Sequence, residues 1–130
     1  MKIKQQTIIG SIITLLTVFL IGCQTSQELK EGTYTSKVDS KVFSFTLYDG
    51  NHYTVKIDDE TAVEGVYEIK NEKVYITDET GPYACGENVT GVYKWIIKDS
   101  KVTFTAVKDE CGGRKSFMTS NLFTIKKLNP

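Results

Sequence analysis

Hydrophobic and polar positions alternate with a period of two along most of the chain after residue 31. Phe43, Phe45 and Leu47 are separated by single residues, and the alternation resumes at Tyr53 after the Asp-Gly-Asn sequence at 49–51. An Asp-Gly pair tolerates the positive φ angles that tight hairpin turns require. The pattern therefore predicts two antiparallel strands joined by a short turn.

The same alternation continues to the C-terminus, with short polar breaks at 71–73 and 99–101. No segment long enough for a helix shows a 3.6-residue period after the N-terminal region. We therefore expect an all-β domain of about eight strands. Predicted strands cover 32–37, 42–48, a segment from Tyr53, 62–70, 74–80, 91–98, 102–109 and about 117–127.

Sequential short strands can form either a sandwich or an up-and-down barrel. Nearly every connection here has hairpin length, which favours an antiparallel meander, and closure of the sheet removes exposed edge strands. An eight-stranded meander barrel is thus the predicted fold. The longest breaks, at 81–91 and 110–114, are expected to form two loops at one rim.

The N-terminal segment has a different pattern, with Lys2 and Lys4 followed by an uncharged run over 8–21. As a helix at about 1.5 Å per residue, this run would cover roughly 21 Å, which is less than the roughly 30 Å hydrocarbon core of a bilayer. The layout is that of a secretory signal, so a cleaved signal helix is favoured over a membrane span.

The run ends in Leu20-Ile21-Gly22-Cys23, which resembles a bacterial lipoprotein signal. The resemblance implies a signal peptide at 1–22, attachment of a diacylglyceryl group to Cys23, and acylation of the new N-terminus by a palmitate-type chain. Several acyl chains hold a protein stably on a membrane. The implied location is the bacterial cell envelope, outside the cytoplasm, and a soluble secreted protein is the alternative.

The segment at 24–31 is polar and lacks apolar periodicity, so residues 23–31 are expected to form a lipidated flexible tether before a barrel domain at 32–130. A flexible segment of this length typically spans about 16 Å. The domain would therefore work close to the membrane surface.

Charge argues against nucleic acid as a partner. Without Lys2 and Lys4, 14 of the 16 basic side chains remain against 16 acidic ones, which gives a net charge of about −2. The lysines are spread among acids along the chain and are joined by a single arginine, Arg114. A phosphate-binding surface needs clustered basic residues.

Three cysteines are present, and lipidation of Cys23 would leave an even pair. Paired cysteines in an exported domain are usually oxidised, so we expect a disulfide between Cys85 and Cys111 that fastens the two long loops together. Free thiols or a metal-binding role are the alternatives, although a zinc site would need further ligands.

Gly32-Thr33-Tyr34, the Gly-Val-Tyr sequences at 65–67 and 91–93, and Cys111-Gly112-Gly113-Arg114 resemble small bacterial lipocalin-like domains of the calycin type over roughly 31–128. Lipocalins pack a late arginine over a tryptophan in the first strand, and Tyr34 stands at that position here. The resemblance implies a cation–π contact of Arg114 with Trp95 or Tyr34 that closes the barrel, with ligand contact as the alternative role of Arg114.

An eight-stranded barrel either fills its interior with side chains or retains one small molecule. Bulky residues expected inside could form a packed core or line a cavity for a small hydrophobic compound. These candidate core or ligand-lining residues are Phe43, Phe45, Tyr53, Tyr67, Tyr93, Trp95 and Phe104.

Candidate catalytic groups are sparse, so an enzyme, a cofactor or a metal site is not expected. His52 is the single histidine and falls in the first hairpin, which favours an exposed turn residue over a general base. The acidic sequences at 58–60 and 78–79 are interpreted as solvated turns, with weak calcium binding as the alternative.

Two functions of different classes follow. The first is a lipid-anchored carrier or sensor that takes a small hydrophobic molecule into a cavity with one open mouth. The second is an envelope interaction module, such as a hydrolase inhibitor or assembly factor, with a filled barrel and a rigid rim. That rim would present Pro82, Tyr83, Glu87 and Arg114 as an exposed cluster.

Overall fold

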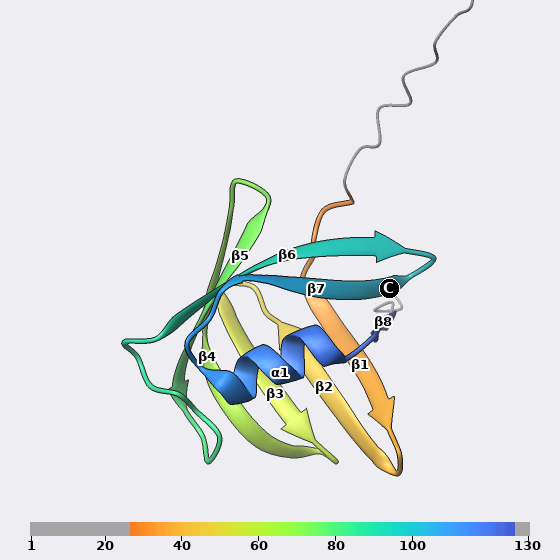
Figure 1. Ribbon diagram of the computed structural model, residues 1–130. Coiled ribbons are helices and arrows are strands. Elements are labelled where there is room, and N and C mark those ends of the chain that lie inside the picture. The colour runs from red at the N-terminus through yellow and green to blue at the C-terminus, as the bar shows by residue number, and fades with distance from the viewer. Residues whose placement is uncertain (1–26, 127–130) are drawn as a thin grey trace, which may run out of the picture.

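The computed structural model describes residues 27–126 and contains one closed antiparallel barrel (Figure 1). Neighbouring strands pair in sequence order, and β1 closes the barrel by pairing with β8 through Thr33–Thr35 and Thr124–Lys126. The all-β meander barrel predicted from the alternation is confirmed. Its elements are β1 (Gly32–Val38), β2 (Lys41–Leu47), β3 (His52–Ile57), β4 (Glu60–Lys70), β5 (Lys73–Thr80), β6 (Thr90–Lys98), β7 (Lys101–Lys108), α1 (Gly112–Ser120) and β8 (Phe123–Lys126).

The predicted hairpin turns occur where the sequence placed them. Gly50 and Asn51 have φ angles of 80° and 64°, and Asn71 and Asp99 have φ angles of 52°. Asparagine, aspartate and glycine adopt this left-handed backbone more readily than other residues. The turns therefore fix the register that brings every second side chain into the barrel.

The helix α1 corrects the prediction of a strand from about residue 117 and of no helix in the domain. Arg114, Phe117 and Met118 have helical spacing, and Arg114 and Met118 are buried. Because Arg114 is a charged residue, the sequence shows no apolar 3.6-residue period over this segment. Two glycines at the start, Gly112 and Gly113, also give the segment low helix propensity.

The barrel has two distinct ends. The connections β1–β2, β3–β4, β5–β6 and β7–β8 lie at one end, which we call the helix end because α1 is part of the last connection. The turns β2–β3, β4–β5 and β6–β7 lie at the other, which we call the N-terminal end because the chain enters β1 there. In Figure 1 the segment before β1 lies at the top of the barrel, away from α1.

The segment at 27–31 corrects the prediction of a free tether up to residue 31. Leu29 is 2% exposed and belongs to the barrel core. The Trp95 indole N–H donates to the carbonyl of Gln27 at 2.9 Å, and the Tyr34 hydroxyl donates to the carbonyl of Lys30. The apolar side chain at position 29 thus closes the N-terminal end. Cys23 and the predicted signal at 1–22 lie outside the described residues.

Replacing Leu29 with alanine is expected to lower the free energy of unfolding by about 2 kcal/mol, because it removes a buried side chain. This loss is at the low end of the range for leucine-to-alanine changes, because a segment near the start of the domain can shift to fill the cavity that the substitution leaves. Urea denaturation measures the loss, and Glu28→Ala, next to it and exposed, serves as control. Equal stability of Leu29→Ala and the parent would contradict closure by Leu29.

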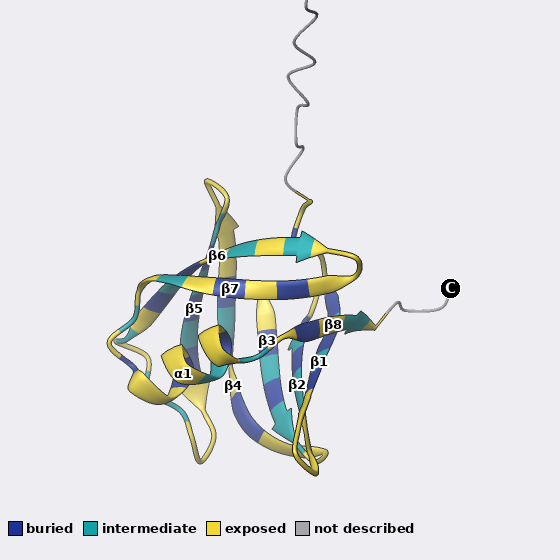
Figure 2. Ribbon diagram, turned by 45° about the vertical axis from the view of Figure 1, so that its right-hand side comes forward, coloured by how far each residue is buried: buried dark blue, intermediate teal, exposed yellow. Residues whose placement is uncertain are grey.

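Buried positions alternate with more exposed ones along the strands (Figure 2), and the core combines predicted aromatic residues with aliphatic ones. Phe45 and Phe104 pack with ring centroids 6.2 Å apart, and Phe104 and Phe123 lie 5.8 Å apart. Of the seven predicted interior residues, Phe45, Tyr53, Tyr67, Tyr93 and Phe104 are buried, whereas Phe43 and Trp95 are half-buried.

Candidate functional site

A cavity of about 260 Å³ lies inside the helix end of the barrel. Its walls are almost entirely apolar, and α1 supplies one side of them with Phe117 and Met118. The barrel is thus not completely filled, although aromatic residues pack its centre. The other lining residues come from β2 to β5 and the loop after β5, and from the start of α1: Phe43, Phe45, Tyr53, Val55, Ile57, Ala62, Val63, Ile76, Asp78, Tyr83, Gly113 and Arg114.

Three charged side chains form the polar part of the site. Arg114 donates from Nη1 to Asp78 Oδ1 at 2.8 Å and from Nε to Asp109 Oδ2 at 2.7 Å. Its Nη2 donates to Asp109 Oδ1 at 2.8 Å and to the carbonyl of Val89 at 2.9 Å. All three side chains are nearly inaccessible to solvent. We call Asp78, Asp109 and Arg114 the charged triad.

Two tyrosines also donate hydrogen bonds to the triad. The Tyr53 hydroxyl donates to Asp78 Oδ1, and the Tyr93 hydroxyl donates to Asp109 Oδ2. Each carboxylate therefore accepts bonds from a phenol, from the guanidinium and from a backbone amide. The amides are those of Cys85, to Asp78 at 2.9 Å, and Cys111, to Asp109 at 2.8 Å.

Glycines on the strands make room for both tyrosines. Gly65 pairs with Tyr53 on one side and with Asp78 on the other, and a Cβ atom there would lie 2.8 Å from the Tyr53 ring. A Cβ atom at Gly91 would lie 2.9 Å from the Tyr93 ring and 2.4 Å from Asp109 Oδ2. The two Gly-Val-Tyr sequences thus include glycines that the triad's geometry requires.

Burial and the triad together shift several pKa values. Burial and the hydrogen bond to Asp78 raise the pKa of Tyr53, and burial and the bond to Asp109 raise that of Tyr93. Burial alone would raise the pKa of Asp109, but the bonds from Arg114, Tyr93 and Cys111 outweigh it and lower that pKa. The triad therefore holds ionised Asp109 and Arg114 against neutral phenols.

The raised tyrosine pKa values predict loss of stability at alkaline pH. An unfolded chain releases phenol protons near pH 10, whereas Tyr53 and Tyr93 keep theirs while folded, so stability falls as pH rises above about 10. Ultraviolet phenolate absorbance should reach its full amplitude only when circular dichroism shows unfolding. In Tyr53→Phe the late absorbance step should be smaller. Full phenolate absorbance from a folded barrel would contradict this prediction.

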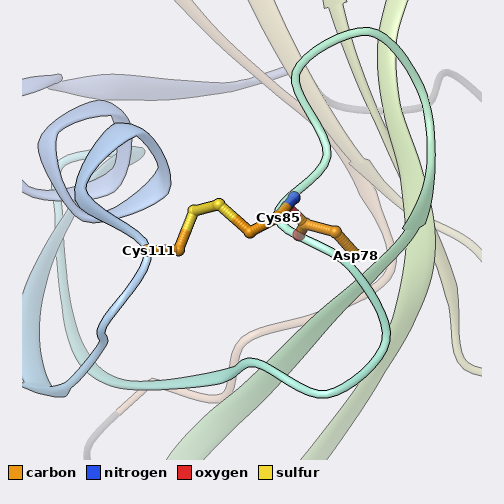
Figure 3. Close-up of side chains that lie close together, drawn as sticks. All are labelled: Asp78, Cys85 and Cys111. Atoms are coloured by element: carbon orange, nitrogen blue, oxygen red, sulfur yellow. A yellow bond between two sulfur atoms is a disulfide. The ribbon is translucent and has the colours of Figure 1, made fainter.

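The predicted disulfide is present, with Cys85 and Cys111 Cα atoms 6.0 Å apart. It ties the loop between β5 and β6 to the residue before α1, and Figure 3 shows Asp78 beside it. The donor atoms of Asp78, Cys85 and Cys111 lie within 4.8 Å of one another, the only such group among residues 27–126. The disulfide occupies both sulfur atoms, so the group offers a metal one carboxylate.

The predicted rim cluster is only partly formed. Pro82, Tyr83 and Glu87 are exposed, with Tyr83 69% exposed, whereas Arg114 is 8% exposed. The prediction that Arg114 joins an exposed cluster is therefore wrong. So is the cation–π contact with Trp95 or Tyr34, because the guanidinium of Arg114 binds two carboxylates instead.

The charged triad was missed in the sequence. The sequence pattern predicts a solvated turn at 78–79, but Asp78 is 1% exposed and lies within β5, on the same face as Val74 and Ile76. Its place in that alternation was the available signal. The other polar candidates agree with the sequence: His52 and the turn at 58–60 are exposed.

Comparison with protein-family models, curated proteins and solved structures finds no match for this chain. The fold and site define a closed eight-stranded antiparallel β-barrel with a helix-covered apolar cavity and a buried charged triad. Within the described part of the chain, no helix has the length and apolar character needed to cross a membrane.

Proposed function

We propose that this protein is a lipid-anchored lipoprotein of the bacterial cell envelope whose lipocalin-like barrel binds a small hydrophobic molecule. The observation that carries the proposal is the cavity of about 260 Å³ beneath α1. Apart from Asp78, Arg114 and the tyrosine hydroxyls, its lining consists of aliphatic and aromatic side chains and one glycine. Such a lining favours apolar ligands.

The cavity volume limits the ligand's size. An apolar cavity of about 150 Å³ is enough to bind benzene, which has six carbon atoms. By that proportion, 260 Å³ suits a compound of about ten non-hydrogen atoms. A long-chain lipid or a sterol is too large to be enclosed.

The anchored end and the cavity lie at opposite ends of the barrel. Gln27 is in contact with Trp95 at the N-terminal end, and the chain between Cys23 and Gln27 reaches at most about 14 Å. A lipid on Cys23 would therefore keep the N-terminal end near the bilayer. The helix end would face away from it, so the ligand would come from the aqueous side or from a partner protein.

The interaction module is the second candidate function, and the exposure of Tyr83 favours it. This ring is 69% exposed on a loop that the disulfide holds in place. Preorganised aromatic side chains often dominate protein interfaces. A non-enzymatic partner contact through Pro82, Tyr83 and Glu87 is compatible with ligand binding, because Tyr83 also lines the cavity.

Native mass spectrometry with 1-octanol as probe tests the carrier function. The full chain should bind one molecule of 1-octanol, or retain a small molecule acquired from its host. Val63→Phe should abolish retention, because the larger ring fills the cavity. Val107→Phe makes the same change at a position 51% exposed and outside the cavity, so it should bind as the parent does.

Both variants need circular dichroism to confirm the fold, since overpacking costs about 1–3 kcal/mol. A parent chain that carries no small molecule and takes up no octanol would contradict the carrier function. Equal retention by the parent and a folded Val63→Phe variant would also contradict it, because binding would then occur elsewhere.

A further inference from the structure

The charged triad at the polar side of the cavity carries an excess of negative charge. Asp78 and Arg114 line the cavity, and Asp109, outside the lining, binds the guanidinium of Arg114. All three side chains are nearly inaccessible to solvent. Every hydrogen bond recorded for Asp78 runs toward its oxygens, from Tyr53, Arg114 and the Cys85 amide. An ionised carboxylate accepts only, so this arrangement fits the charged form of Asp78.

The positive charge of Arg114 is already engaged. Four of its five N–H groups donate to Asp78, Asp109 and the Val89 carbonyl. The N-terminus of α1 adds roughly half a positive charge nearby. Two carboxylates outweigh these positive contributions, so the charged triad and the helix N-terminus together carry about half a negative charge. Water screens this charge poorly because the side chains are buried.

The connections at the helix end add to this asymmetry. Outside the triad, the segments at 38–41, 57–60, 80–90 and 108–123 hold six acidic and three basic side chains. The connections at the N-terminal end, at 27–32, 47–52, 70–73 and 98–101, hold five of each. The acidic side chains at the helix end are Asp39, Asp58, Asp59, Glu60, Glu87 and Glu110, and the basic ones are Lys41, Lys108 and Lys115.

One lone-pair site of Asp78 has no hydrogen-bond donor in the described part of the chain. Among residues 27–126, Asp78 receives three hydrogen bonds, whereas a carboxylate offers about four lone-pair sites. Asp78 also lines the cavity. An ammonium or hydroxyl group could donate to that position, whereas a carboxylate would meet a like charge.

We infer that the cavity selects small apolar amines and alcohols and rejects carboxylates of the same size. The inference rests on the proposed binding function and adds the chemistry of the ligand's head group. An apolar chain of about eight carbons fills the hydrophobic part, and the ammonium or hydroxyl group points toward Asp78. A cationic head group gains further from the acidic helix end.

Octylamine, 1-octanol and octanoate test the inference, because they share one chain and differ in head-group charge. Calorimetry is performed on the full chain in digitonin, whose rigid steroid is too large for the cavity. The heat measured with the folded Val63→Phe variant, whose cavity is filled, gives the contribution of each compound's partition into the micelles. Octylamine should bind at least tenfold more tightly than octanoate, a difference of about 1.4 kcal/mol, and 1-octanol should also bind.

The outcomes separate the two proposals. Octanoate that binds as tightly as octylamine would overturn the head-group selection and leave the binding function intact. Failure of all three compounds to bind above the Val63→Phe reference would overturn the binding function itself. The comparison needs no substitution in the charged triad, so it does not depend on the folding of a triad variant.

Discussion

Replacing Arg114 with methionine is expected to lower the free energy of unfolding by about 3–5 kcal/mol. The substitution keeps an unbranched apolar stem but leaves the carboxylates of Asp78 and Asp109 buried without a counter-charge. It also removes the donor to the Val89 carbonyl. Urea denaturation near pH 7 measures the loss.

Two further variants show whether the loss comes from the triad. Lys115→Met changes the next residue of α1, which is exposed, and should alter stability by less than about 0.5 kcal/mol. Combining Arg114→Met with Asp78→Asn and Asp109→Asn removes the uncompensated charges and should recover part of the loss. A loss below 1 kcal/mol for Arg114→Met alone would show that the ion pairs do not hold the helix end together.

Replacing both Cys85 and Cys111 with serine is expected to lower the free energy of unfolding by roughly 3.5 kcal/mol. The bridge spans a sequence separation of 26, and its removal allows the unfolded chain more conformations. The loop that carries Tyr83 and the start of α1 would also no longer be held together, so octanol should bind more weakly.

Denaturation of the oxidised parent and the double serine variant measures this effect. A reducing agent should bring the parent to the stability of the variant and leave the variant unchanged. Equal stability of the oxidised parent and the variant would contradict a stabilising role for the disulfide.

The strands could be predicted because the barrel's inside and outside impose a period of two. Phe45 and Tyr53 fall on the inner face as the alternation requires, and Gly50 and Asn51 adopt the turn that their residue types favour. The even number of cysteines left after the predicted lipidation of Cys23, together with predicted export, was enough to predict the Cys85–Cys111 pair. The strands and turns depend on residues close in sequence, and the disulfide prediction depends on the number of cysteines.

Other features depend on partners far apart in the chain. Asp78 and Arg114, which are 36 residues apart in sequence, are buried because each neutralises the charge of the other. Considered alone, either charged side chain would be predicted to lie on the surface. For the same reason the helix α1 was not predicted: the first buried residue on its inward face is Arg114, which breaks the apolar pattern. Leu29 falls within the predicted tether because a single apolar residue among polar ones shows no periodicity.

The cavity could not be deduced from side-chain size. The sequence holds enough aromatic residues to fill a small barrel, yet Phe43 and Trp95 are only half-buried. Phe43 packs against Phe117 of α1 with ring centroids 5.9 Å apart, at the cavity wall. The remaining volume depends on the placement of α1, which the alternation did not predict.

Methyl NMR of Met118 tests ligand binding in the cavity most directly. Met118 lines the cavity, and the chain's other methionine is Met1, so a ¹³C-methyl label gives one reporter inside the barrel. Adding 1-octanol should shift the Met118 signal in the parent and leave it unchanged in Val63→Phe. A Met118 signal that stays in place at saturating octanol would contradict the proposed binding function.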